Sequence, residues 1–200
     1  MADSFQPRPA PLKTAPSLGR DRFRRVVLTG FMGAGKSTVG RLLAAKLGWF
    51  FLDVDACIED TAGTRAEDLF TSLGEAAFRQ LEAETLASCL LQSNVIIAPG
   101  GAAIDMPRNQ QALAASHGAL IVFLDAPFGT LIERCLLEER QGRSTYRPLL
   151  HNHEVALARY AARRSLYAAH AHLTVTVSDR RPDEIASQIL SVIQAGKGLG

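Results

Sequence analysis

The stretch "GFMGAGKST" runs from Gly30 to Thr38 and directly follows the run "RRVVLT" at residues 24–29. It matches the pattern G-x-x-x-x-G-K-[ST], whose glycines let successive backbone N–H groups turn toward the oxygens of a phosphate. A helix that starts near Ser37 adds its positive dipole end to this anion site. In the pattern, the lysine reaches the β- and γ-phosphates and the hydroxyl can bind Mg²⁺.

The alternative for this stretch is a glycine-rich turn between a strand and a helix, with a solvated lysine. An apolar run before the motif and an amphipathic pattern after it favour the phosphate loop. The residues predicted to bind a nucleoside triphosphate are Gly33, Ala34, Gly35, Lys36, Ser37 and Thr38.

From this motif onward, short apolar runs alternate with longer amphipathic ones. Alternation of this kind predicts a parallel sheet with helices on both faces. The expected fold is a three-layer α/β/α P-loop NTPase fold with a five-stranded parallel sheet. The predicted strands are Val26–Thr29, Phe50–Leu52, Val95–Ala98, Ala119–Leu124 and Leu173–Val177. The predicted helices are Ser37–Leu47, Glu75–Leu91, Thr130–Glu139, Glu154–Ala169 and Asp183–Ile193.

Composition sets the limits of this prediction. The 200 residues fit one domain of ordinary size, and the net charge of +2 argues neither for nor against nucleic acid. No apolar run approaches the roughly 20 residues that span a bilayer, which favours a soluble protein. The three cysteines form no CxxC pair, which favours reduced thiols in the cytosol.

The first 24 residues differ from the rest of the chain. They hold four of the nine prolines, several arginines and no periodic apolar pattern. We expect residues 1–24 to be a disordered basic tail and residues 25–200 to form one domain. The alternative for this Arg-rich segment is a transit peptide, whereas it lacks the apolar region of a secretory signal.

Two carboxylates follow the predicted second strand. The stretch "FFLDVD" ends with Asp53 and Asp55, and side chains two apart on an extended strand point to the same side. Ligands of open α/β sheets bind at the carboxyl ends of the strands, so we expect both carboxylates in the site. One carboxylate can hold Mg²⁺ through water, and the other can accept a hydrogen bond from a substrate hydroxyl. The alternative is that either residue caps a helix through Ile58.

Six short segments together resemble the shikimate kinase family, of the nucleoside-monophosphate-kinase-like P-loop group. They occur in the family's order and spacing from about Arg25 to Ile193, nearly the whole predicted domain. The segments are "GFMGAGKSTVGRLLAAKLG", "FLDVDACIE", "GEAAFRQLE", "PGG", "RPLL" and "ARRSLY". The resemblance implies a kinase that phosphorylates shikimate with ATP.

For the acceptor, the resemblance implies a clamp of two arginines on the shikimate carboxylate. Arg79 of "GEAAFRQLE" matches the first arginine, and a planar guanidinium suits a carboxylate. The alternative is an exposed helical arginine paired with Glu75 or Glu82. Arg163 of "ARRSLY" matches the second arginine, which leaves its neighbour Arg164 facing solvent.

"VIIAPGGAAI" supplies a second glycine segment after the third predicted strand. Gly100 and Gly101 can bring backbone close to a small ligand, although a simple turn is the alternative. The family usually has three glycines here, and this chain has Ala102 in the third place. A positive φ at that alanine would be costly. The departure leaves the exact acceptor open.

Two arginine-bearing loops complete the expected site. "EERQGRSTYRPLL" is a charged segment with glycine and proline, and the resemblance implies a mobile lid over ATP at about residues 140–152. Arg147 matches the lid arginine that reaches the phosphates, and Arg140 matches one near the nucleotide. Arg180 of "SDRRPDE" is the candidate in the loop against adenine. Solvated charged loops are the alternative for both segments.

The resulting prediction is an ATP-dependent kinase that converts shikimate to 3-phosphoshikimate. Mg²⁺ is the expected metal, bound by Ser37 and Asp53, and the expected catalytic residues are Lys36, Asp55 and Arg147. The expected partners are shikimate and ATP, without nucleic acid or membrane, in a cytoplasmic monomer. Two alternatives stay open: a kinase of the same fold acting on another small hydroxy acid or polyol, and a non-catalytic ligand sensor.

Overall fold

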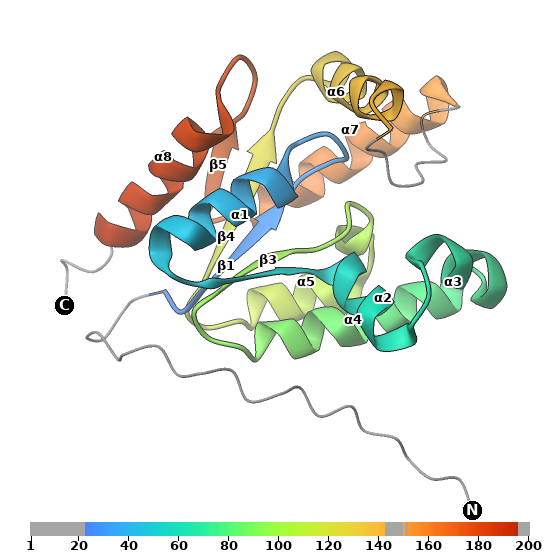
Figure 1. The fold of residues 1–200 in the computed structure, drawn as a ribbon, viewed down its shortest axis with the longest axis horizontal. Coiled ribbons are helices and arrows are strands. Elements are labelled where there is room, and N and C mark those ends of the chain that lie inside the picture. Colours follow the sequence, from blue (N-terminus) through green and yellow to red (C-terminus); the bar gives the residue numbers. More distant parts are fainter. Residues whose placement is uncertain (1–22, 143–149, 151, 196–200) are drawn as a thin grey trace, which may run out of the picture.

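The computed structural model describes residues 23–142, 150 and 152–195. Its centre is a five-stranded parallel sheet in the order β2-β3-β1-β4-β5 (Figure 1). The strands are β1 (Arg25–Thr29), β2 (Phe50–Asp53), β3 (Val95–Ala98), β4 (Ala119–Asp125) and β5 (Leu173–Thr176). All five were predicted to within one residue at each end, and the parallel α/β architecture is confirmed.

Strand β1 lies in the middle of the sheet because it is apolar on both faces. Its Val26, Val27 and Leu28 have no exposed surface. Val27 pairs in register with Ile97 of β3 and with Ile121 of β4. The core therefore forms around the strand that leads into the glycine-rich loop, so the loop starts at the buried centre of the sheet.

Helices cover both faces of the sheet. Helix α1 (Lys36–Leu47) packs against α8 (Pro182–Ala195), and α1 also contacts strands β1, β2 and β3 (Figure 1). Helix α7 (His153–His170) packs on β4, where the rings of Tyr167 and Phe123 lie 5.2 Å apart. Helices α4 (Glu75–Leu90) and α6 (Phe128–Arg140) complete the set of helices that the sequence predicted.

The structure has three further helices and one 3₁₀ turn: α2 (Val54–Ala62), α3 (Ala66–Leu73), η1 (Ala103–Asp105) and α5 (Pro107–Ala114). Of these, only α2 was foreseen, as the helix through Ile58 in the alternative for the two carboxylates. Asp53 is the N-cap residue of α2, but its side chain makes no capping hydrogen bond. Helix α2 begins immediately after β2 ends at Asp53, so Asp55 lies in its first turn. The expectation that Asp53 and Asp55 share one side of an extended strand was therefore wrong.

Several predictions concern residues beyond the described part. The tail at 1–22 lies outside it, and so does most of the predicted lid, including Arg147. Helix α6 ends at Arg140, and the description continues to Gly142. Among the described helices, none has the length and apolar character needed to cross a membrane.

Candidate active site

The loop between β1 and α1 requires its glycines for two separate reasons. Gly30, Gly33 and Gly35 all have positive φ angles, of 146°, 77° and 83°. At Gly33 a Cβ atom would lie 2.3 Å from the carbonyl oxygen of Leu131, and at Gly30 one would lie 2.7 Å from that of Leu124. Only glycine combines the backbone angle with the close contact at these two positions. The loop is thus closely packed against β4 and α6.

Lys36 is the first residue of α1, and its side chain folds back over the loop. The Nζ atom donates hydrogen bonds to the carbonyl oxygens of Gly30, at 2.9 Å, and Phe31, at 3.2 Å. The first turn of α1 contains no acidic residue, and the cap residue Gly35 has no side chain to bond the amides of this turn. The helix N-terminus and the ammonium group therefore present positive charge to the same place.

Ser37 and Asp53 form the pair expected to bind a metal. The Ser37 hydroxyl donates a 2.7 Å hydrogen bond to Oδ2 of Asp53, which joins α1 to the end of β2. Within the described residues no group of three or more His, Cys, Asp or Glu could hold a metal ion. One hydroxyl and one carboxylate suit Mg²⁺, which keeps several waters and takes phosphate oxygens as further ligands.

Asp55 is the most perturbed carboxyl group of the site. Its pKa is raised from 3.8 to about 6, chiefly by burial and then by the negative charges of Glu82 and Asp53. The positive charges of Lys36 and Arg79 oppose this rise. Asp55 therefore lies within the electrostatic reach of the phosphate-loop lysine and of an arginine of α4, which belong to the two predicted subsites.

Arg79 is held by two glutamates of its own helix. Its Nη1 donates to Oε2 of Glu82 at 2.9 Å, and its Nε lies 3.8 Å from Oε1 of Glu75. The ion pairing named as the alternative for Arg79 therefore exists. It does not exclude ligand binding, because the guanidinium carries five N–H donors. The rings of Phe70 and Phe78 lie within 5.8 Å and 5.6 Å of the guanidinium carbon.

Glu82 is a site residue that sequence reasoning considered only as an ion-pair partner. It is completely buried, and its Oε1 has no hydrogen-bond partner among the described residues. A Cβ atom on Gly100 would lie 2.5 Å from this oxygen and 3.3 Å from Oδ1 of Asp55. Both carboxylates thus lie against Gly100, and any side chain at this position would displace them.

Ala102 adopts an ordinary right-handed conformation, with φ −86° and ψ −10°. The expected cost of a positive φ at this position is therefore absent, and the replacement of the family's third glycine causes no backbone strain. The preceding Gly101 accepts a hydrogen bond through its carbonyl oxygen from the Tyr167 hydroxyl of α7. Burial raises the pKa of that hydroxyl well above its usual range, so it remains a donor.

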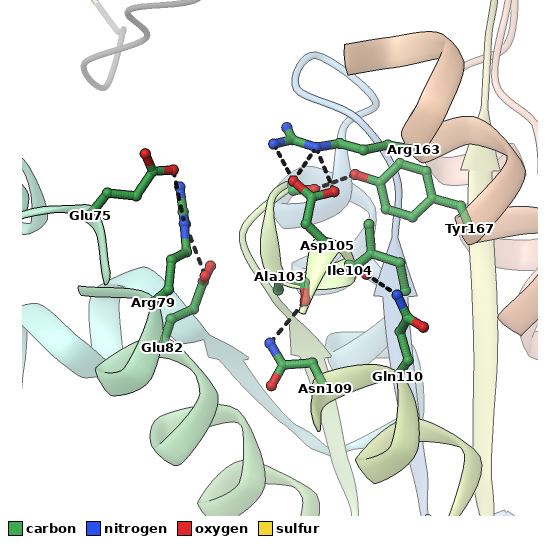
Figure 2. A network of polar contacts seen from close by, with 11 residues as sticks. Glu75, Arg79, Glu82, Ala103, Ile104, Asp105, Asn109, Gln110, Arg163 and Tyr167 are labelled. Carbon is green, nitrogen blue, oxygen red and sulfur yellow. Dashed lines mark hydrogen bonds and ion pairs between the residues drawn. The ribbon is translucent and has the colours of Figure 1, made fainter. Parts of the chain in front are cut away.

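The two neighbouring arginines of α7 face different environments. Arg163 is 4% exposed and binds Asp105 of η1 through Nε and Nη2 (Figure 2). Arg164 has a side chain that is 54% exposed, and it pairs with Asp125 at the end of β4. The assignment of Arg163 as inward-facing and Arg164 as solvent-facing agrees with this arrangement. The Asp105 partner was not foreseen.

The arginines predicted to contact the nucleotide lie in two different surroundings. Arg180 donates from Nη1 to Oε1 of Gln188 at 2.7 Å, and it lines a cavity of about 460 Å³ between α6 and the β5–α8 loop. Arg134, which the sequence did not single out, lines the same cavity and donates to the carbonyl oxygen of Val177. Arg140 is exposed at the end of α6. A second cavity, of about 430 Å³, lies beside α7, and none of the predicted site residues that the structure describes lines it.

Comparison with known proteins identifies the group to which this site belongs. The family model described as Shikimate kinase matches residues 32–194. The chain belongs to the shikimate kinase family. It is 37% identical over 172 residues to the shikimate kinase of Synechococcus sp. (strain CC9902), covering 85% of this chain and 86% of that protein. It is 39% identical over 164 residues to that of Lactococcus lactis subsp. lactis (strain IL1403), covering 82% and 94%.

Solved structures of shikimate kinases share the fold. The shikimate kinase from Acinetobacter baumannii in complex with shikimate superimposes with a TM-score of 0.77 at 31% identity, covering 88% of this chain and 96% of that one. The enzyme from Aquifex aeolicus gives a TM-score of 0.73 at 33% identity, covering 88% and 99%. The resemblance of the sequence to the shikimate kinase family is therefore confirmed.

Within this shikimate kinase fold, two groups of side chains face one another. Figure 2 shows Arg79 with its glutamates on one side and Arg163 with Asp105 on the other, with η1 between them. The charge of Lys36 acts on Asp55 from the phosphate loop, and the charge of Arg79 acts on it from α4. Of the residues predicted for the acceptor, Asp55, Arg79 and Gly100 are brought together, and Gly101 contacts the helix that carries Arg163.

Proposed function

We propose that this protein transfers the γ-phosphoryl group of MgATP to the 3-hydroxyl of shikimate, which gives 3-phosphoshikimate for aromatic amino acid biosynthesis. The observation that carries the proposal is the position of Asp55. This half-buried carboxylate lies within the electrostatic reach of both the phosphate-loop lysine and Arg79, in a chain of the shikimate kinase family. A group in that position can hold an acceptor hydroxyl against the phosphate.

At the nucleotide end, the proposal gives each residue a task that its contacts support. The backbone of Gly33, Ala34 and Gly35 and the first turn of α1, with Thr38, surround the phosphates. Lys36 exchanges its bonds to loop carbonyls for bonds to phosphate oxygens. Ser37 and Asp53 would hold Mg²⁺, and the metal would neutralise charge on the phosphates.

At the acceptor end, Asp55 accepts a hydrogen bond from the reacting hydroxyl and takes its proton late in the transfer. Arg79 and Arg163 bind the carboxylate of the acceptor, and the backbone of Gly100 and Gly101 lies against the ring. Positioning and charge stabilisation supply most of the rate, because the loose transition state of phosphoryl transfer leaves little for a base to do.

Three arginines are assigned to the nucleotide in this proposal. Arg147, in the predicted lid outside the described residues, stabilises the transferring group, and Arg140 lies beside the nucleotide. Arg180 contacts the adenine from the loop before α8, where it lines the 460 Å³ cavity. Residues 25–200 act as one kinase domain behind the tail at 1–24. We propose a cytoplasmic monomer without nucleic-acid or membrane partners, which light scattering on the purified protein tests for its oligomeric state.

The raised pKa of Asp55 predicts the acid side of the pH profile. A protonated carboxyl group neither accepts the hydroxyl hydrogen bond as a charged group nor takes its proton. We therefore expect kcat/KM for shikimate to fall about tenfold per pH unit below a pKa of about 6 in the free enzyme. Initial rates at saturating MgATP between pH 4.5 and 8 measure this limb. A flat profile down to pH 5 would contradict the role of Asp55.

The same group affects stability with a defined sign. The pKa of Asp55 in the folded protein, about 6, is above the ordinary value of 3.8 for an aspartate, so the folded state binds its proton more tightly than the unfolded state does. Ionising the group therefore destabilises the fold as pH rises from about 4 to 6, by about 3 kcal/mol for the unliganded protein. The Asp55→Asn variant lacks this contribution. We expect its free energy of unfolding to fall less than that of the wild type over this pH range, as measured by urea denaturation.

A substrate panel tests the proposed function against its alternatives. We expect ADP release that depends on shikimate and is weak with other small hydroxy acids or polyols. Turnover with another acid but not with shikimate would indicate a different acceptor. Binding of shikimate and ATP without any ADP release would indicate a non-catalytic sensor.

A further inference from the structure

Arg163 already holds a carboxylate that belongs to the chain itself. Its Nε lies 3.0 Å from Oδ1 and 2.9 Å from Oδ2 of Asp105, and its Nη2 lies 2.6 Å from Oδ2 (Figure 2). The Nε and Nη2 donors of Arg163 are thus both bonded to Asp105. An acceptor carboxylate can bind these two donors only if it displaces Asp105.

Arg163 itself is held in place from several sides. It is 4% exposed, and its guanidinium carbon lies 5.9 Å from the centre of the Phe31 ring in the phosphate loop. One turn later on the same helix, the Tyr167 hydroxyl donates to the carbonyl oxygen of Gly101. The guanidinium of Arg163 is therefore fixed inside the protein, and it does not move when its carboxylate partner leaves.

The backbone that carries Asp105 is also fixed, whereas its carboxylate is bound, among the described residues, only by Arg163 and is partly exposed to solvent. The side chain of Asn109 donates to the carbonyl oxygen of Ala103 at 2.8 Å, and that of Gln110 donates to Ile104 at 2.8 Å. The Asp105 side chain, however, is 46% exposed at the end of η1. A rotation of this side chain alone returns its carboxylate to water, where solvation compensates for the lost ion pair.

The arginine on the opposite side is different. Glu82, the partner of Arg79, has a side chain that is only 1% exposed. Releasing it from Arg79 would leave a buried carboxylate without a counter-ion, which is strongly unfavourable. Of these two resident carboxylates, Asp105 is therefore the one that can be exchanged.

We propose that Asp105 competes with the carboxylate of the acceptor for Arg163 and so lowers the affinity of the site for every carboxylic acid. The inference rests on the proposed function in taking the acceptor to be a carboxylic acid and Arg163 to be one of the residues that bind its carboxylate. Exchanging one carboxylate for another adds little free energy, so an acid with a carboxylate alone binds weakly. An acid that also offers hydroxyl groups to the rest of the site gains contacts that Asp105 cannot provide.

Asp105→Asn tests this competition because it keeps the shape of the side chain and removes its charge. We expect the variant to bind shikimate about tenfold more tightly than the wild type. The same gain is expected for cyclohex-1-ene-1-carboxylate, which has the carboxylate but none of the hydroxyl groups. Calorimetric titration in a buffer free of carboxylates, sulfate and phosphate measures both. Unchanged or weaker binding of the two acids would overturn the proposal.

The ion pair of the neighbouring arginine on α7 provides a matched control. Arg164 pairs with Asp125 outside the predicted site through Nε and Nη2, so Asp125→Asn removes an ion pair of the same bidentate geometry. We expect it to leave the affinity for both acids unchanged. A gain in affinity equal to that of Asp105→Asn would show a general effect of charge and would overturn the competition.

Thermal unfolding separates an effect on binding from damage to the fold. Without ligand, Asp105→Asn should melt at a lower temperature because Arg163 loses its counter-ion, and shikimate should raise the melting temperature more than in the wild type. Asp105→Ser, a smaller neutral side chain, should behave in the same way. If the wild type fails to phosphorylate shikimate, the proposed function fails, but the titrations with cyclohex-1-ene-1-carboxylate still decide the role of Asp105.

Discussion

Replacing Lys36 with alanine is expected to lower kcat about a thousandfold, which removes turnover in an ordinary assay. The Nζ atom lies over the phosphate loop, bonded to the carbonyl oxygens of Gly30 and Phe31. When phosphates are bound, Lys36 is the cation that α1 places at the loop. It stabilises the negative charge on the oxygens of the transferring phosphoryl group. Steady-state ADP release at saturating shikimate and MgATP measures the loss.

The fold should survive this substitution, because α1 is held by other residues. Val39 and Leu43 of the same helix are buried in the core, whereas Lys36 is only partly buried. Lys46→Ala is the matched control, since Lys46 sits near the other end of α1 and forms a surface pair with Asp183 at 2.9 Å. We expect the control to keep wild-type rates. If Lys36→Ala retained activity within a few-fold of the wild type, the phosphate-binding role of this loop would be wrong.

Replacing Arg79 with alanine is expected to weaken acceptor binding by about 2–5 kcal/mol. The structure adds a reason beyond the lost contact with the acceptor. Without Arg79, the buried Glu82 keeps a carboxylate that has no counter-ion and faces Gly100 and Asp55. That charge repels an incoming acid, so the loss should appear mainly in KM for shikimate and much less in KM for ATP.

A second substitution separates the two contributions. In the double variant Arg79→Ala, Glu82→Gln the repelling charge is absent, and we expect partial recovery of KM for shikimate. Arg65→Ala is the control, because Arg65 pairs with Glu67 at 3.1 Å on the exposed surface of a neighbouring helix. An unchanged KM for shikimate in Arg79→Ala would remove this residue from the acceptor site.

The sheet and the phosphate loop could be predicted because their signals are local. Each strand is a short apolar run, and the glycines at positions 30, 33 and 35 provide the positive φ angles that the loop requires. Helices α3 and α5 were missed because each has only eight residues and buries few of them. Helix α3 has no buried residue, and in α5 only Asn109 and Leu113 are buried. Their positions depend on what they pack against.

The partners of the site residues could not be predicted, because they depend on tertiary structure. The sequence placed Arg163 on a helix and gave it an inward role, but Asp105 is 58 positions away and meets it only through η1. The surroundings of the unpaired Glu82 Oε1 likewise depend on Gly100, which approaches this oxygen from another segment of the chain. The charged Glu82 three residues after Arg79, on the buried side of α4, was the available signal. It was interpreted only as an ion-pair partner.

The central claim is that one site joins the phosphate loop to a carboxylic-acid acceptor. Phosphorus-31 NMR of wild-type protein with Mg²⁺, ATP and shikimate tests it most directly. We predict a new phosphomonoester signal on the 3-hydroxyl of shikimate that grows one-to-one with ADP. If ADP forms together with inorganic phosphate alone, or if no ADP forms at all, the claim is contradicted.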